Sequence, residues 1–306
     1  MKKIGFIKKV LLTGALALLA GTYGFYNLNK NKEANTQNIE CIKGVESIIE
    51  QEGNKPDVII ILQNHIDQNV SNKSTYSKVN NINSIKSICD ICNTLYDQFG
   101  IKTLLPEGLD PSFEKSYKKN GKLSFQQYDS AGYTKHLEDM INGRNWNLKF
   151  AEDPNKINEI ERLKKPLKKQ YQLVLKETTE SLDSIDKKYE NDPYSLKKEL
   201  EINSLIKRSN ENIKDFVDSY MSDETTQKFY DLMIEQRDKM YAEACKSAKN
   251  DGETPLIIVY GSAHCYTLPK HLNGLSYIII KPEGLSKIKP IDLQGIKERF
   301  YMRLSR

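Results

Sequence analysis

Two of the four histidines in the chain, His65 and His264, each follow a short apolar run that is rich in β-branched residues. The first run spans residues 57–62, and the second spans residues 256–260. Imidazole changes its protonation near neutral pH and also ligates metal ions. Runs of this kind are typical of buried parallel strands, whose carboxyl ends share one edge of the sheet where ligands bind. The spacing therefore predicts that both imidazoles meet in one pocket, where the chain carries out chemistry or binds a ligand.

Acidic residues end two further predicted strands and are candidates for the same edge. Glu107 follows the apolar run 101–105, where it can orient an imidazole, act as a general base or ligate a metal ion. A loop residue that caps a nearby helix is the alternative interpretation of Glu107. Glu152 and Asp153 end the run 147–151, and Asp153 precedes a proline, as helix N-caps often do. Glu152 is therefore the better site candidate of the two.

Helix geometry brings a basic residue, Arg237, to the level of this edge. From Arg237 to Asn250 a helix descends by about 20 Å at roughly 1.5 Å per residue. The strand 256–260 then rises by a similar distance at roughly 3.3 Å per residue. Arg237 is therefore predicted to lie at the height of His264, 27 residues away. An arginine there can bind a carboxylate or phosphate or stabilise a developing oxyanion, and a surface salt bridge is the alternative.

The five cysteines cannot all be paired in intramolecular disulfides. Cys89 and Cys92 are spaced like a redox or metal motif, but they lie on the apolar stripe of a predicted helix. Free cysteine packs there as a small hydrophobe, and the sequence has no second pair to complete a zinc site. Cys265 directly follows His264, and burial at the start of the next helix is favoured over a nucleophilic role.

The elements that must position these residues alternate between strands and helices, which predicts an α/β fold with a mostly parallel central sheet flanked by helices. A highly charged helical insertion at about 155–222, interrupted at Pro166 and at 191–193, is expected to project as a hairpin of two or three helices. The expected strands are 57–62, 101–105, 147–151, 256–260 and 277–281, and the other expected helices are 39–51, 83–99 and 222–249.

The first 29 residues have the pattern of a signal peptide or an N-terminal membrane anchor. Residues 2–9 contain four lysines, and residues 10–26 are almost entirely apolar or small. The chain is therefore expected to be extracytoplasmic, either secreted or anchored in the membrane by this single segment, with the positive flank in the cytoplasm. A buried N-terminal helix is the alternative. A linker and short helix at 30–52 are expected to precede an α/β domain at 53–306.

The charge balance gives no support for nucleic-acid binding. Among the 306 residues the formal net charge is +5, but the four N-terminal lysines supply most of it. No acidic residue precedes Glu33, so the rest of the chain carries about +1. Because no basic stripe interleaved with aromatic residues is present, no nucleic-acid partner is expected. The length is ample for a packed core.

Four short motifs resemble those of the erythromycin esterase, ChaN, TraB and Tiki superfamily. They are residues 62–65, the pair Glu107-Gly108, residues 237–240 and residues 261–264. Members carry a His motif after the first strand, a Glu after the second, an Arg-Asp/Asn-x-x-Met helix and a Gly-x-x-His after a late strand. The resemblance covers roughly residues 57–281. Leu62 stands where many relatives have glycine, and Tyr241 occupies the position of the family's methionine.

The resemblance implies a hydrolase that acts on an ester or a peptide bond. It implies that His65 is a general base or metal ligand with Glu107 as its carboxylate partner. It implies that His264 is a second base or ligand and that Arg237 stabilises the oxyanion. No Gly-x-Ser-x-Gly elbow is present, which argues against a serine nucleophile and makes Ser262 a turn residue. The residues expected to contact a small-molecule or peptide substrate are Asn64, Glu152, Gly261 and Ser262.

Cofactor, oligomeric state and catalytic status stay open at this point. One alternative is a divalent metal ion of unknown identity held by His65, Glu107 and His264. Another is a non-catalytic haem-binding protein at the cell surface, as ChaN-like members are. Haem binding needs only an exposed axial histidine or tyrosine, and the chain has 17 tyrosines. His136 and His271 are predicted to be solvated or structural.

Overall fold

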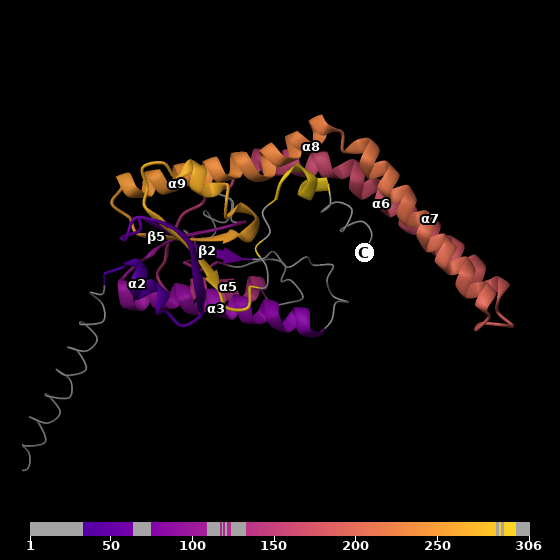
Figure 1. Ribbon diagram of the computed structural model, residues 1–306, viewed down its shortest axis with the longest axis horizontal. Coiled ribbons are helices and arrows are strands. Elements are labelled where there is room, and N and C mark those ends of the chain that lie inside the picture. Colours follow the sequence, from indigo (N-terminus) through magenta and orange to yellow (C-terminus); the bar gives the residue numbers. More distant parts are fainter. Residues whose placement is uncertain are drawn as a thin grey trace, which may run out of the picture.

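A six-stranded sheet with helices on both faces forms the body of the molecule (Figure 1). The strand order is β1-β6-β2-β5-β3-β4, and all neighbours except β1 and β6 run parallel. The predicted α/β class is therefore confirmed. The structure, a computed structural model, describes residues 33–63, 75–108, 117, 119, 121–123, 133–285, 288 and 291–297.

The five predicted strands are present in the predicted order, and an additional strand at residues 45–52 precedes them. The strands are β1 (Val45–Glu52), β2 (Val58–Gln63), β3 (Thr103–Pro106), β4 (Asn147–Leu148), β5 (Leu256–Gly261) and β6 (Tyr277–Pro282). The helices are α2 (Thr36–Glu40), α3 (Thr75–Phe99), α5 (Tyr133–Asn142), α6 (Pro154–Lys188), α7 (Leu196–Tyr220), α8 (Asp223–Tyr230) and α9 (Gln236–Asn250). Three short turns complete them, namely η2 (Asp231–Glu235), η3 (Ser262–His264) and η4 (Leu268–His271).

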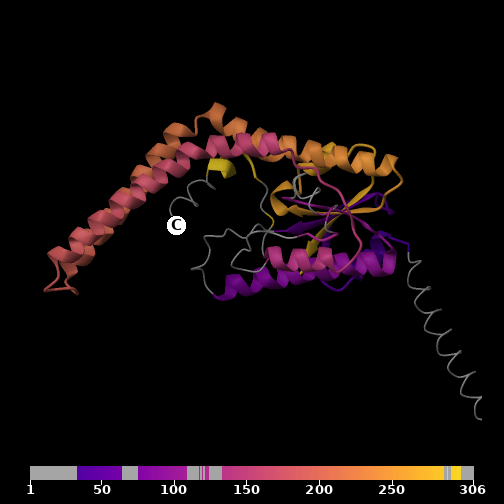
Figure 2. The ribbon, with the colours of Figure 1, turned by 180° about the vertical axis from the view of Figure 1, so that it is seen from behind.

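The two central strands, β2 and β5, are buried along their whole length. Successive side chains of a strand point to opposite faces, so each strand contributes to two cores. Ile59 and Ile61 join the core beneath α3 and α5, whereas Ile60 and Leu62 join the core beneath α9. Figures 1 and 2 show these helices on opposite faces of the sheet. The near-continuous apolar runs seen in the sequence are explained by this burial on both faces.

The predicted helix at 39–51 is wrong over most of its length. The helix α2 ends at Glu40, and Gly44 then turns the chain with a φ of 96°. From Val45 the chain forms the edge strand β1, which pairs antiparallel with β6. The apolar residues of this stretch are compatible with either structure, and hydrogen bonding to the distant strand β6 decides between them.

The charged insertion is a two-helix arm, formed by α6 and α7, that projects from the body (Figures 1 and 2). The predicted turn at 191–193 is confirmed, because α6 ends at Lys188 and α7 begins at Leu196. The predicted break at Pro166 is wrong, since α6 continues through this residue. Proline removes one hydrogen bond from the helix, but the adjacent Leu167 is buried in the apolar cluster at the base of the arm.

The helix predicted at 222–249 begins where its capping residue indicates, but it contains a register shift. The Ser222 side chain accepts a hydrogen bond from the Thr225 amide, as an N-cap does. One turn of π-helix, η2, separates α8 from α9 and ends two residues before Arg237. Turns of this kind often occur at functional sites. The strand predicted at 147–151 is shorter than expected, since only β4 pairs with β3.

None of the described helices is both long and apolar enough to cross a membrane. The segment 1–29, predicted to be a signal peptide or anchor, lies outside the described residues, as do most of residues 109–132. The end of the chain is described as far as residue 297, with helical residues at 293–297.

Candidate functional site

Three parallel strands, β2, β3 and β5, end around the buried carboxylate of Glu107. This residue follows β3 directly, and its amide donates to the Val259 carbonyl at 2.9 Å. Its Oε2 accepts hydrogen bonds from the Gly261 amide at 2.5 Å and from Gln63 Nε2 at 3.2 Å. The Glu107 side chain has no exposed surface. The ends of both β2 and β5 therefore fix this carboxylate in place.

Arg237 joins Glu107 to a second buried carboxylate, Glu152. One guanidinium nitrogen, Nη1, lies 3.0 Å from Glu107 Oε1, and the other, Nη2, forms an ion pair with Glu152 Oε1. Glu152 also accepts a hydrogen bond from the Tyr241 hydroxyl at 3.2 Å. Burial alone lowers the pKa of Arg237, but the charges of Glu107 and Glu152 outweigh it and raise that pKa well above its ordinary value. The guanidinium is therefore permanently charged.

The third carboxylate, Asp238, orients the imidazole of His264. His264 Nδ1 lies 2.8 Å from Asp238 Oδ1, and both side chains are almost fully buried. His264 Nε2 lies 4.0 Å from Glu107 Oε1. A carboxylate beside Nδ1 favours the tautomer whose proton is on Nδ1 and whose Nε2 lone pair is free. Nε2, which carries that lone pair, is the imidazole atom that lies 4.0 Å from Glu107 Oε1.

Two local features of the sequence place these side chains together. At the start of α9, Arg237, Asp238 and Tyr241 occupy positions i, i+1 and i+4, which lie on one side of a helix. After β5, Gly261 is followed by the short turn η3, which places His264 against α9. The ion pairs of Arg237 with Glu107 and Glu152 confirm the prediction from helix length that Arg237 lies at the carboxyl edge of the sheet.

We call this cluster the rim site. It consists of Gln63, Glu107, Glu152, Arg237, Asp238, Tyr241, Tyr260 and His264. Four predicted residues, Glu107, Glu152, Arg237 and His264, lie in it. Glu152 contributes to it while Asp153 caps α6, as predicted, by accepting a hydrogen bond from the Asn155 amide at 2.9 Å.

Four members of the rim site were not predicted from the sequence: Gln63, Asp238, Tyr241 and Tyr260. In the sequence, Asp238 is only the second residue of the Arg-Asp/Asn-x-x-Met motif, and Tyr241 stands where that motif has methionine. Tyr260 is easier to recognise from the sequence, because it is a polar ring at the penultimate position of β5, on the face that packs against α9. A hydroxyl in an otherwise apolar strand requires a buried partner, which is a signal that sequence can provide.

Other predicted site residues are placed differently. His65 and Asn64 lie outside the described residues, so their roles stay predictions. Gly261 contributes its backbone amide to Glu107, and Ser262 begins the turn η3. Among the described residues, no group of three His, Cys, Asp or Glu side chains is placed to hold a metal ion. Because the predicted ligand set includes His65, the metal also stays a prediction.

The cysteines pack as the sequence predicts. Cys92 is completely buried in the core beneath α3, and Cys89 packs against the same core. Burial, helped by the charges of Asp90 and Asp139, raises the pKa of Cys89 to about 12. Burial likewise raises the pKa of Cys265 to about 12, which leaves little thiolate near neutral pH and argues against a nucleophile.

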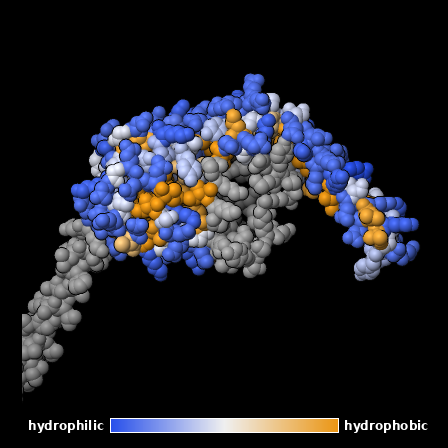
Figure 3. All heavy atoms as spheres, viewed as in Figure 1, coloured by the Kyte–Doolittle hydropathy of each residue, from blue (hydrophilic) through white to orange (hydrophobic). Residues whose placement is uncertain are grey.

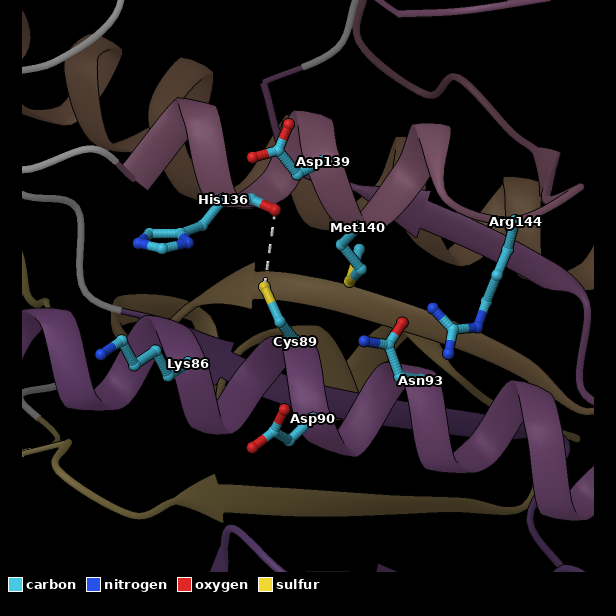
Figure 4. A pocket seen from close by; sticks show the side chains of 8 residues that line it. All are labelled: Lys86, Cys89, Asp90, Asn93, His136, Asp139, Met140 and Arg144. Carbon is cyan, nitrogen blue, oxygen red and sulfur yellow. Dashed lines mark hydrogen bonds between the residues drawn. The ribbon is translucent and has the colours of Figure 1, made fainter.

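A separate hollow between α3 and α5 contains Cys89 and the predicted structural residue His136 (Figure 4). Its volume is about 350 Å³, and the Cys89 thiol donates to the His136 carbonyl at 3.7 Å. The remaining histidine, His271, lies 3.2 Å from a carboxylate oxygen of Glu235, so it too has a structural partner. The residues lining the hollow are Lys86, Cys89, Asp90, Asn93, His136, Asp139, Met140 and Arg144.

Comparison with known proteins adds no assignment: no protein-family model, no curated protein and no solved structure matches the chain. The relationship to the erythromycin esterase, ChaN, TraB and Tiki superfamily therefore stays a prediction from four short motifs.

Proposed function

We propose that the chain is an extracytoplasmic hydrolase that cleaves an ester or peptide bond at the rim site. The observation that carries this proposal is the buried hydrogen bond between Asp238 and His264. An imidazole held by a carboxylate at Nδ1 is suited to accept a proton at Nε2, because the carboxylate stabilises the imidazolium that forms.

In the proposed reaction, His264 acts as the general base. A water molecule attacks the carbonyl carbon of the substrate and gives one proton to His264 Nε2. Since Nε2 and Glu107 Oε1 are 4.0 Å apart, one water can form hydrogen bonds to both atoms before it attacks. The bond to the leaving group then breaks, and the imidazolium returns the proton to the leaving oxygen or nitrogen. Asp238 keeps its negative charge throughout.

Arg237 is proposed to hold the two glutamates and to stabilise the oxyanion. Its Nη atoms are occupied by Glu107 and Glu152, whereas its Nε is buried and has no hydrogen-bond partner in the described part of the chain. A buried and preorganised donor of this kind stabilises the negative charge that develops on the substrate oxygen.

His65 is proposed as a further base or metal ligand. The reaction proposed above for the described residues includes no step through a metal ion. Of the predicted ligands, Glu107 accepts from Gly261 and Gln63 and is paired with Arg237. A cation bound to Glu107 therefore has to share that carboxylate with a guanidinium, which disfavours binding unless His65 contributes.

Hydrolysis of chromogenic esters and of a mixed peptide library by the purified full-length chain tests the proposal. Each assay is run with chelator and with added Mg²⁺, Mn²⁺ or Zn²⁺. We expect His264→Gln and Glu107→Gln to lower kcat/KM by about 10²-fold or more, the usual contribution of a general base and its partner. Circular dichroism verifies that the variants are folded.

The matched control is His271→Gln, because His271 also pairs with a carboxylate but lies outside the rim site. This variant is expected to keep full activity. If the wild type cleaves no substrate, either with chelator or with any of the added metal ions, the proposal of a hydrolase is wrong. If haemin then produces a Soret shift that His264→Gln abolishes, the haem-binding alternative is correct instead.

A further inference from the structure

Three rings form a continuous stack behind the rim site: Tyr241, Tyr260 and His264. The Tyr241 and Tyr260 centroids are 4.3 Å apart with planes at 27°, and the Tyr260 and His264 centroids are 4.3 Å apart with planes at 26°. These near-parallel stacks hold aromatic rings at close packing distance. Tyr260 therefore covers one face of the imidazole and restricts the rotation of that ring.

The hydroxyl of Tyr260 also holds the carboxylate that orients this imidazole. It donates to Asp238 Oδ1 at 2.9 Å, and His264 Nδ1 lies 2.8 Å from the same oxygen. The other oxygen, Asp238 Oδ2, is buried and has no hydrogen-bond partner among the described residues. Both interactions therefore fall on one oxygen, and Tyr260 contacts both members of the Asp238–His264 pair.

The donor role of Tyr260 does not depend on pH in the neutral range. Burial raises the pKa of the Tyr260 phenol well above its ordinary value, and the negative charge of Asp238 raises it further. The phenol therefore keeps its proton. Since Tyr260 has no exposed surface, water does not compete for the bond to Asp238.

We infer that Tyr260 is a positioning residue of the rim site, which fixes Asp238 and His264 in one geometry without contacting the substrate. Its ring restrains the imidazole and its hydroxyl restrains the carboxylate. The kinetic consequence of this inference rests on the proposed function. The restraint itself is a property of the resting protein and is tested without any substrate.

The first test is Tyr260→Phe, which keeps the stacked ring and removes the hydroxyl. The full-length chain is labelled with ¹⁵N-histidine, and the ring N–H signals are followed by NMR; His264→Gln identifies the signal of His264 among the four histidines. We expect the His264 Nδ1–H proton to exchange with solvent about tenfold faster in Tyr260→Phe, because its acceptor is no longer fixed. An unchanged exchange rate would overturn the inference.

The matched control is Tyr277→Phe. Tyr277 is also buried, and its hydroxyl also donates to a carboxylate, Glu50 Oε1, at 2.6 Å. It lies at the first position of β6, at the end of the strand opposite the rim site. Removal of its hydroxyl is therefore expected to leave the His264 signal unchanged. Equal effects of Tyr277→Phe and Tyr260→Phe would mean that a general loss of stability, rather than positioning, causes the change.

The second test is kinetic. On any ester or peptide that the wild type cleaves, Tyr260→Phe is expected to lower kcat about tenfold while KM stays within about twofold, because only the orientation of the base is disturbed. Faster proton exchange without cleavage by the wild type would refute the hydrolase and leave the positioning role standing. Cleavage that Tyr260→Phe does not slow would refute the positioning role alone.

Discussion

The rim site and the arm are built from the same kinds of charged residues but place them in opposite surroundings. In the rim site the Glu107 and Asp238 side chains have no exposed surface, and the Arg237 side chain is 18% exposed. In the arm, the paired Lys188 and Glu201 side chains are 58% and 40% exposed. Exposed pairs of this kind are solvated, screened by salt and worth little stability.

The arm is stabilised by a different interaction, an apolar seam at its base. Leu167, Val174, Ile213 and Val217 are buried between the two helices and the body. Farther out the arm is mostly hydrophilic, with hydrophobic patches near its far end, where Leu196 and Leu200 are exposed at the start of α7 (Figure 3). Burial, rather than residue type, therefore distinguishes the charges of the rim site from those of the arm.

The largest difference between the two regions is expected when an arginine is removed from each. Arg237→Met leaves Glu107 and Glu152 buried without their cation, so we expect a loss of about 3 kcal/mol in the free energy of unfolding. Arg162→Met removes an arginine that lies 3.9 Å from Glu159 on the arm and is 74% exposed, so no measurable loss is expected. Urea denaturation followed by circular dichroism measures both.

Arg237→Lys provides the control for charge. It keeps a cation beside the two carboxylates but not the planar group that contacts both. Its free energy of unfolding is therefore expected to lie between those of the wild type and Arg237→Met. If Arg237→Met and Arg162→Met destabilise the chain equally, the buried arginine contributes no more to stability than the exposed one, which contradicts the expectation.

A smaller effect is expected from removing a tyrosine hydroxyl in each region. Tyr241 donates to Glu152 at 3.2 Å in the buried rim site, and Tyr189 donates to Glu201 at 3.3 Å on the arm. Tyr241→Phe is expected to cost about 1 kcal/mol, because a buried acceptor loses a donor. Tyr189→Phe leaves its acceptor open to water, and its thermal unfolding midpoint is expected to match that of the wild type. A larger loss for Tyr189→Phe would reverse the comparison.

The smallest effect concerns the pH dependence of the arm. Hydrogen bonds from Lys168 and Lys164 lower the pKa of Glu161 below its ordinary value of 4.5, although burial opposes them. A lowered pKa in the folded state contributes stability above pH 4.5, and that contribution is lost as the pH falls through the lowered value. Glu161→Gln is therefore expected to cost a few tenths of a kcal/mol at neutral pH.

The difference in free energy of unfolding between Glu161→Gln and the wild type is expected to disappear in acid. It is also expected to shrink in about 1 M salt, because salt screens the attraction between Glu161 and its lysine partners. Urea denaturation at a series of pH values follows the first change, and added NaCl follows the second. A difference that persists in acid would mean that Glu161 acts through packing rather than through its charge.

Much of the fold was predictable because its signals are local. The apolar runs that become β2 and β5 identify buried strands, and the caps at Asp153 and Ser222 identify where helices begin. The stretch 45–52 was not predictable from local pattern, since its pairing with β6 depends on a strand more than 200 residues away. The continuation of α6 through Pro166 was missed because tertiary packing outweighs the local cost of proline.

For the candidate site, the apolar runs and the rise of a helix along the chain are local properties, and they indicated Glu107, Arg237 and His264. Glu152 was indicated as well, although the strand predicted to end beside it stops at Leu148. The partners of these side chains depend on the tertiary structure. Asp238, Tyr260 and His264 meet because α9 packs against one face of β5, and which side chains touch across that interface depends on its spacing and orientation. Such contacts are a property of the packed interior and leave no fixed spacing in the sequence.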